Sequence, residues 1–128
     1  MKNLFFYFTV FLFIIFSAVG CSDDDEPTIS LDDTVWDFLV VYDSNTSWHA
    51  DVTFNADGST VYDEPASPGQ YTTYGTWTLN GNMLTYDMDT SSTSDPDDYI
   101  FTGTLSGNTM SGTYTFDGQN KNWSATKY

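Results

Sequence analysis

A two-residue alternation of apolar and polar side chains constrains the fold of this chain more than any other feature. Residues 48–54 read WHADVTF and residues 110–116 read MSGTYTF, so that every second side chain is large and apolar or small. Aromatic residues and β-branched threonine dominate these segments, as they do in β-strands. No window shows the 3.6-residue apolar stripe of an amphipathic helix. The sequence therefore predicts an all-β fold.

Glycine-containing dipeptides separate the alternating segments. Asp57-Gly58, Asn80-Gly81 and, more weakly, Ser106-Gly107 suit two-residue hairpin loops, in which both positions take positive φ. With these residues as the loops, large side chains face apolar or small partners on one face. The cross-strand pairs expected on this basis are Phe54–Val61, Trp77–Leu84, Gly75–Tyr86, Gly103–Met110 and Phe101–Gly112.

The alternation and the turns together predict eight strands. Their expected ranges are 34–41, 47–54, 59–64, 70–79, 83–88, 98–105, 109–116 and 122–127. Consecutive hairpins with one apolar face form an antiparallel meander, and closing the meander removes its exposed edges. We therefore expect an eight-stranded up-and-down β-barrel over residues 34–128. A two-sheet β-sandwich is the alternative architecture.

The first 20 residues have the pattern of a secretory signal peptide. Lys2 precedes an apolar run from Leu4 to Phe16, and small residues follow at Ser17, Ala18 and Gly20. The alternative is a transmembrane helix, but a span needs about 20 apolar residues and this run is shorter. Residues 1–20 are therefore expected to be removed from the mature protein.

The segment that follows resembles the start of a bacterial lipoprotein. Ala18-Val19-Gly20-Cys21 resembles a lipobox, which implies that Cys21 becomes the lipidated N-terminus. An acyl anchor of two or more chains holds a protein stably on a membrane. Ser22, Asp23, Asp24, Asp25 and Glu26 come next and resemble the acidic export signal of surface-displayed lipoproteins. We expect residues 21–33 to be a lipidated tether, whose residues 22–33 reach at most ~40 Å, and the protein to lie on the cell-surface side of the outer membrane.

Residues 31–128 carry a series of short motifs in a characteristic order. The series begins with Trp36 in the first strand and the hairpin motifs at residues 54–59 and 75–82. It continues with Met110-Ser111-Gly112-Thr113-Tyr114 and with residues 123–127 in the last strand. This series resembles the lipocalin-like domains of small lipoproteins. The resemblance implies a closed barrel that binds a ligand, and it implies that Lys127 packs against Trp36.

Composition excludes several classes of function. Three Lys and Arg residues against 18 Asp and Glu give a formal net charge of −15, which disfavours nucleic acid and anionic lipid headgroups as partners. One Cys excludes a disulfide framework and a multi-cysteine metal site. His49 is the only His and lies on the outward face by alternation, so no Ser-His-Asp or Cys-His arrangement is expected. We predict no enzyme activity, no catalytic residue, no resident metal and no cofactor.

Two functions remain. In the first, the barrel holds a small apolar ligand among inward aromatic side chains, while small inward residues such as Gly75, Gly103 and Gly112 leave room. The candidate ligand-binding residues are Trp36, Trp48, Trp77, Tyr86, Tyr99, Tyr114 and Trp123. The same residues could instead simply fill the barrel. In the second, the filled barrel binds a protein or a glycan through its exterior, with Tyr42, Tyr62 and Tyr74 exposed beside acidic loops.

An acidic stretch between two predicted strands is a weak candidate for a calcium site. Its carboxylates are Asp87, Asp89, Asp95, Asp97 and Asp98. Calcium takes several oxygen ligands, but the stretch lacks the spacing of a calcium loop. A solvated acidic loop is therefore the favoured interpretation.

Overall fold

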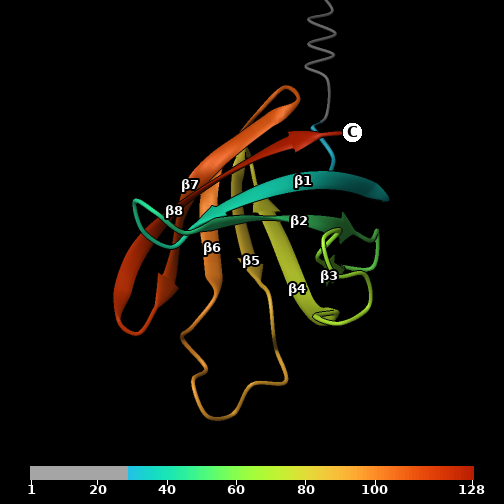
Figure 1. The fold of residues 1–128 in the computed structure, drawn as a ribbon. Helices are drawn as coiled ribbons and strands as arrows, with labels where there is room; N and C mark the ends of the chain where they lie inside the picture. The colour runs from blue at the N-terminus through green and yellow to red at the C-terminus, as the bar shows by residue number, and fades with distance from the viewer. Residues whose placement is uncertain (1–28) are drawn as a thin grey trace, which may run out of the picture.

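The structure is a computed structural model that describes residues 29–128 (Figure 1). The expected signal peptide, Cys21 and the acidic residues Ser22 to Glu26 lie outside the described residues. The strands are β1 (Thr34–Val41), β2 (Ser47–Phe54), β3 (Ser59–Asp63), β4 (Thr73–Asn80), β5 (Met83–Asp87), β6 (Ile100–Ser106), β7 (Thr109–Phe116) and β8 (Gln119–Lys127). No helix in this part of the chain is both long and apolar enough to cross a membrane.

The eight strands close into an antiparallel up-and-down barrel. Each strand pairs with its neighbours in sequence, and β8 pairs with β1 to complete the ring. The predicted fold class is confirmed, and the β-sandwich alternative is wrong. In the closing pair Lys127 stands opposite Trp36, and Ala125 stands opposite Phe38. The barrel therefore has no free strand edge, which removes the template for edge-to-edge association.

The predicted hairpin registers are wrong, although all eight predicted strands are present. Asn80 pairs with Met83, so the loop is Gly81-Asn82, and among these two residues only Gly81 has positive φ, at 63°. A glycine with positive φ at the first loop position is typical of a type II′ turn. Gly107 (φ 59°) plays the same part between β6 and β7. The pairs observed across these two turns include Trp77–Tyr86, Leu79–Leu84, Phe101–Tyr114, Gly103–Gly112 and Leu105–Met110.

The first hairpin differs from the prediction by one residue. Phe54 pairs with Thr60 rather than Val61, because three residues, 56–58, form the loop. The amide of Gly58 donates to the carbonyl of Asn55 at 3.0 Å, and Gly58 has a φ of 85°. A one-residue change of register exchanges the two faces of a strand. Thr60 and Tyr62 consequently point inward in β3, where Val61 was expected.

A tight turn that the sequence interpretation overlooked joins β7 to β8. Asp117 (φ 49°) and Gly118 (φ 68°) both have positive φ, as a type I′ loop requires. Phe116 pairs with Gln119 across it, so β8 begins three residues earlier than expected. The strand expected at 70–79 starts only at Thr73, and the strand expected at 98–105 starts at Ile100.

The two ends of the barrel differ. At one end, the chain leads into β1 past Leu31, which is fully buried, and the amide of Tyr128 donates to the carbonyl of Val35. Figure 1 shows the start of the described chain, in blue, and the C-terminus on this side. The long β5–β6 connection, residues 88–99, lies at the opposite end. We call the first end the closed end and the second the mouth.

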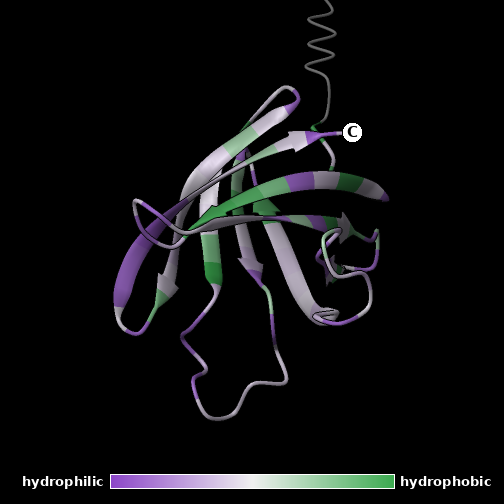
Figure 2. Cartoon of the chain, viewed as in Figure 1, coloured by the Kyte–Doolittle hydropathy of each residue, from purple (hydrophilic) through white to green (hydrophobic). Residues whose placement is uncertain are grey.

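The core lies inside the ring and is made of inward side chains from every strand. Figure 2 shows the alternation as bands of hydrophobic and hydrophilic colour along β1. Phe38 is central: its ring stacks on Trp123 at 4.8 Å between centroids, and it meets Tyr86 and Phe101 edge-on at 5.9 and 6.0 Å. Offset-stacked and edge-to-face pairs add to the free energy gained from burying aromatic surface. The aromatic core therefore occupies the middle of the barrel.

Candidate functional site

All seven predicted ligand-binding aromatics belong to the barrel core or pack against it. Trp36, Tyr86, Tyr114 and Trp123 are at most 2% exposed. Trp48, Trp77 and Tyr99 are partly buried and pack against the same core. The structure thus brings the seven residues into one aromatic interior, and Tyr99 also lines a pocket that opens to solvent.

Each tryptophan indole N–H in this set already has a protein acceptor. Nε1 of Trp36 donates to Thr34 Oγ1 at 2.9 Å, and Nε1 of Trp77 donates to the carbonyl of Asn55 at 3.0 Å. Nε1 of Trp123 points between two strands and donates to the carbonyls of Thr102 and Thr113 at 3.2 and 3.1 Å. A buried donor that is satisfied inside the fold is costly to displace. These rings are therefore fixed parts of the wall.

The small inward residues do not leave open space, contrary to the expectation from the sequence. A Cβ placed on Gly103 would lie 2.6 Å from Cζ2 of Trp123 and 2.3 Å from the carbonyl oxygen of Ser111. A Cβ on Gly75 would lie within 2.7 Å of the carbonyl oxygen of Met88. Neighbouring backbone and the Trp123 ring fill the volume that these glycines vacate. Glycine is needed here for close approach, not for a cavity.

A ladder of aromatic rings leads from this interior to the mouth. Phe101 stacks on Tyr114 at 4.9 Å, and Tyr114 lies parallel to Tyr99 at 6.1 Å. Tyr99 contacts Phe116 at 5.2 Å, and Phe116 meets Tyr42 edge-on at 5.6 Å. Burial raises the pKa of Tyr114 to about 12. The ladder makes the mouth a continuation of the hydrophobic core.

Tyr62 is buried, so its predicted exposure is wrong. It is 4% exposed, because the three-residue loop before β3 turns it inward. Its hydroxyl accepts a hydrogen bond from Nε1 of Trp48 at 2.7 Å and donates to Oε1 of Glu64 at 2.8 Å. Burial, followed by this bond to Glu64, raises the pKa of Tyr62. Tyr42 and Tyr74, at 39% and 67%, are exposed as predicted.

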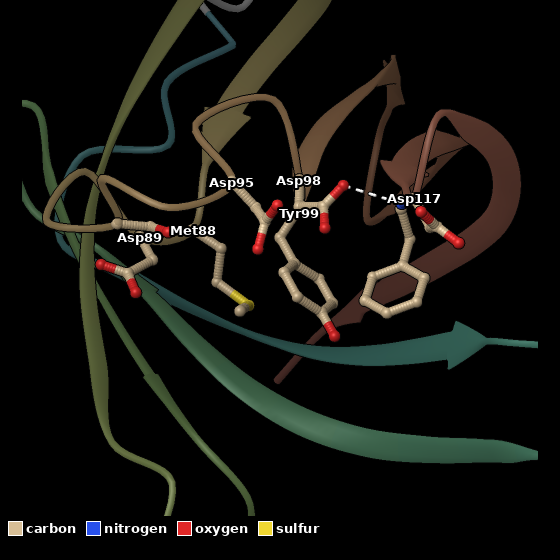
Figure 3. A pocket seen from close by; sticks show the side chains of 8 residues that line it. Met88, Asp89, Asp95, Asp98, Tyr99 and Asp117 are labelled. Atoms are coloured by element: carbon tan, nitrogen blue, oxygen red, sulfur yellow. Dashed lines mark hydrogen bonds between the residues drawn. The ribbon is translucent and has the colours of Figure 1, made fainter.

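A pocket of about 390 Å³ opens at the mouth, between the β5–β6 connection and the β7–β8 turn. We call it the mouth pocket, and its lining residues are Met88, Asp89, Ser92, Asp95, Asp98, Tyr99, Phe116 and Asp117. Figure 3 shows the side chains of Met88 and Tyr99 extending into it with the Asp95 carboxylate between them. Asp98 and Asp117 lie along one side, and Asp89 lies on the other. The pocket thus combines an apolar floor with an acidic rim.

Backbone hydrogen bonds hold the rim of the mouth pocket. The amide of Asp117 donates to Oδ1 of Asp98 at 2.8 Å, which ties the β5–β6 connection to the β7–β8 turn. Oδ1 of Asp89 accepts from the amide and hydroxyl of Ser91 at 3.0 and 2.6 Å. Tyr99 has a φ of 60°, and its amide donates to the carbonyl of Thr115 at 2.7 Å. A non-glycine residue held in this region is strained and needs such support.

Burial also affects the phenol on the floor of the pocket. It raises the pKa of Tyr99, and the neighbouring Asp98 carboxylate adds to the increase. The ring therefore stays neutral at physiological pH, and the negative charge of the pocket comes from its aspartates.

The sequence interpretation found Tyr99 and the acidic stretch that borders this pocket but missed Met88 and Phe116 as site residues. Met88 directly follows β5 and Phe116 ends β7, and both lie beside a loop that was interpreted only as acidic. Both residues occupy inward positions of the two-residue alternation, at the ends of two alternating segments, and this pattern could have identified them from the sequence. Within residues 29–128, no group of three or more His, Cys, Asp or Glu side chains is placed to hold a metal ion.

Two buried hydroxyls inside the barrel have no hydrogen-bond partner among the described residues. They are Oγ1 of Thr60 and the hydroxyl of Tyr86, both 0–1% exposed. Burial raises the pKa of Tyr86.

On the outer wall, Nδ1 of His49 lies 2.7 Å from Oδ1 of Asp37, and the His49 side chain is 58% exposed. His49 therefore lies outward, as predicted, and away from the mouth pocket.

Comparison with known protein families, with curated proteins and with solved structures found no match to this chain.

Proposed function

We propose that this protein is a membrane-anchored lipoprotein of the cell surface whose lipocalin-like barrel binds a small ligand at its mouth without catalysing a reaction. The mouth pocket carries the proposal, because it is a concave site with an apolar floor and a few polar groups around it. The described chain begins at the opposite, closed end. An anchor on Cys21 would therefore join the barrel at the end opposite the mouth.

The packing of the barrel supports a ligand at the mouth rather than deep inside. The indole N–H groups are satisfied, and Trp123 fills the space beside Gly103. A ligand can still extend the aromatic ladder outward from Tyr99 and Phe116 without displacing the core. Catalysis is not part of the proposal, because Ser92 in the pocket has no histidine partner and His49 lies on the outer wall.

Native mass spectrometry of residues 22–128, exposed to an extract of the source cells, tests the binding function. The barrel closes entirely within residues 34–127, so this soluble fragment retains the whole site. A defined added mass that disappears when Phe116 is replaced by Ala supports a ligand at the mouth. A clean mass of the protein alone, in every extract, contradicts the proposal.

Surface display is tested in cells with the full chain. Cys21→Ser should release the protein from the membrane fraction, because the thiol is the proposed attachment point of the lipid. Replacing Asp23, Asp24 and Asp25 by Asn should keep the protein lipidated but hide it from protease added outside the cells. If the Cys21→Ser protein stays in the membrane fraction and the Asn variant stays accessible to protease, these results contradict the proposed location at the cell surface.

A second candidate function is binding of a protein or glycan through the exterior of a filled barrel. It is favoured by Tyr71 and Tyr74, which are 51% and 67% exposed near the start of β4 at the mouth end. Exposed tyrosines supply large contact area at little entropic cost. Pull-down from surface extracts with wild type and with Tyr74→Ala tests it. Recovery of the same partners by both proteins would argue against this surface.

A further inference from the structure

We propose that the ligand of the mouth pocket is an organic cation, with an ammonium group carried on an apolar or aromatic body. This inference rests on the binding function proposed above and specifies its chemical class. The site is the cavity between the β5–β6 connection and the β7–β8 turn, and the charge around the cavity selects the occupant. The floor and the rim give two separate lines of support.

The floor fits an apolar or aromatic body. Phe116 and Tyr99 are two rings near the outer end of the ladder, and Met88 lines the pocket with them, with a thioether that adapts to irregular shapes. The faces of aromatic rings carry negative charge, so they attract a cation placed within about 6 Å. An aromatic ligand would add one more ring to the ladder while its charged end stays near the rim.

The rim fits a positive charge. Four of the eight lining residues are aspartates, namely Asp89, Asp95, Asp98 and Asp117, and no lining residue is basic. They approach from two sides of the cavity, and their hydrogen bonds described above use backbone amides and a serine hydroxyl as donors. Within residues 29–128, no cationic side chain forms an ion pair with the carboxylates of this cavity.

The surroundings of the mouth strengthen this preference. Further carboxylates at this end of the barrel are Asp43, Glu64 and Asp97 in the connections, and Asp63 and Asp87 at the ends of β3 and β5. The basic residue at this end, Lys121, is already engaged: its Nζ donates to the carbonyl of Tyr42 at 2.9 Å and lies 3.9 Å from the centre of the Tyr42 ring. A cleft lined by one sign of charge concentrates ligands of the opposite sign. Anionic ligands are disfavoured for the same reason.

A bare metal ion does not fit as well as an organic cation. The described residues hold no group of three or more carboxylates placed for a metal, and the floor is apolar. A divalent cation needs several oxygen ligands at short distance. An ammonium on an apolar body uses both the rim and the floor.

Three probes of matched shape separate the contribution of charge to the binding affinity from the contribution of apolar contact. Phenethylamine is a cation at neutral pH, 2-phenylethanol is its neutral counterpart, and 3-phenylpropionate is an anion. Each is titrated into residues 22–128 by calorimetry at low and at physiological salt. We expect the cation to bind at least about fivefold more tightly than the neutral probe at low salt, with the difference shrinking as salt screens the rim.

Variants at the rim and at a distance locate the effect. Asp95→Asn and Asp89→Asn should each weaken binding of phenethylamine by about two- to fivefold and leave the affinity for 2-phenylethanol unchanged. Asp32→Asn removes the same charge at the closed end and should change neither. Phe116→Leu should weaken both probes, and circular dichroism verifies that each variant stays folded.

The outcomes distinguish this inference from the binding function beneath it. Equal affinity for the cation and the neutral probe, or an equal effect of Asp32→Asn and Asp95→Asn, overturns the cation preference while leaving a mouth site in place. Absence of binding by phenethylamine overturns it as well, and the native mass measurement then decides whether another class of ligand occupies the pocket. Selective cation binding that depends on Asp89 and Asp95 supports the inference.

Discussion

The absence of a side chain at Gly103 is a requirement of the fold, and Gly103→Ala tests this directly. A Cβ there would lie 2.3 Å from the carbonyl oxygen of Ser111 on β7 and 2.6 Å from Cζ2 of Trp123 on β8. Both distances are well below van der Waals contact. Since one obstacle is backbone, β6 and β7 must move apart to admit the methyl group.

Overpacking of a well-packed core costs about 1–3 kcal/mol, and a backbone obstacle places this case near the upper limit. For a domain of this size, about 3 kcal/mol corresponds to a fall in Tm of roughly 10–25 °C. Urea and thermal unfolding of residues 22–128, followed by circular dichroism, measure the loss. Ser111→Ala, a change on the exposed face of the same strand pair, should stay within about 0.5 kcal/mol of wild type.

A double-mutant cycle separates the two obstacles. Trp123→Phe removes Cζ2, so Gly103→Ala should cost about 1 kcal/mol less in that background than in wild type. The carbonyl of Ser111 remains, so the cost should not vanish. A Gly103→Ala protein within about 1 kcal/mol of wild type would refute the reasoning, since it would mean that the strands have room for a side chain here.

Three further changes probe other parts of the barrel. Tyr62→Phe leaves the indole N–H of Trp48 without its acceptor and should cost about 1–3 kcal/mol in urea unfolding, whereas Tyr74→Phe, at an exposed position, should cost almost nothing. Gly118→Val forces a β-branched residue into a φ of 68° and should destabilise the barrel by about 1–2 kcal/mol; an unchanged urea midpoint would argue against the type I′ turn. Stability should also fall in alkali, because burial raises the pKa of Tyr114 to about 12 from an ordinary 10.0, and raises those of Tyr62 and Tyr86 as well. Their neutral phenols favour the folded state, so this contribution is complete below about pH 10 and declines as the pH rises from there towards the folded-state values; urea midpoints at about pH 9, 10 and 11 that do not decrease would contradict it.

The fold class was predictable because a period of two and glycine turns leave few solutions. The registers were not, because the same dipeptide can occupy different positions relative to the two-residue loop, depending on which of its residues takes positive φ. In Asn80-Gly81 the glycine alone does so, and the loop moves one residue along the chain. The sequence shows the dipeptide but not this choice.

The candidate site was predictable only in part. Alternation correctly placed Trp36, Tyr86, Tyr114 and Trp123 inside the barrel. It could not show that Trp123 occupies the space beside Gly103, because that contact depends on the exact pairing of three strands. The mouth pocket combines residues from the β5–β6 connection and the β7–β8 turn, which meet because β6 pairs with β7, and its shape depends on how the long β5–β6 connection folds over this hairpin.

The pairing of β1 with β8 has a consequence for how the chain reaches its final form. Seven of the eight strand pairings join neighbours in sequence, whereas this one joins the first strand to the last. Until residues 119–127 are in place, β1 and β7 each keep an unpaired edge, and Phe38 lacks the Trp123 ring on which it stacks. A chain that is still being made or exported therefore cannot complete its core. Formation of the barrel has to wait for its last strand, and a truncation within β8 should leave an open, aggregation-prone sheet rather than a smaller barrel.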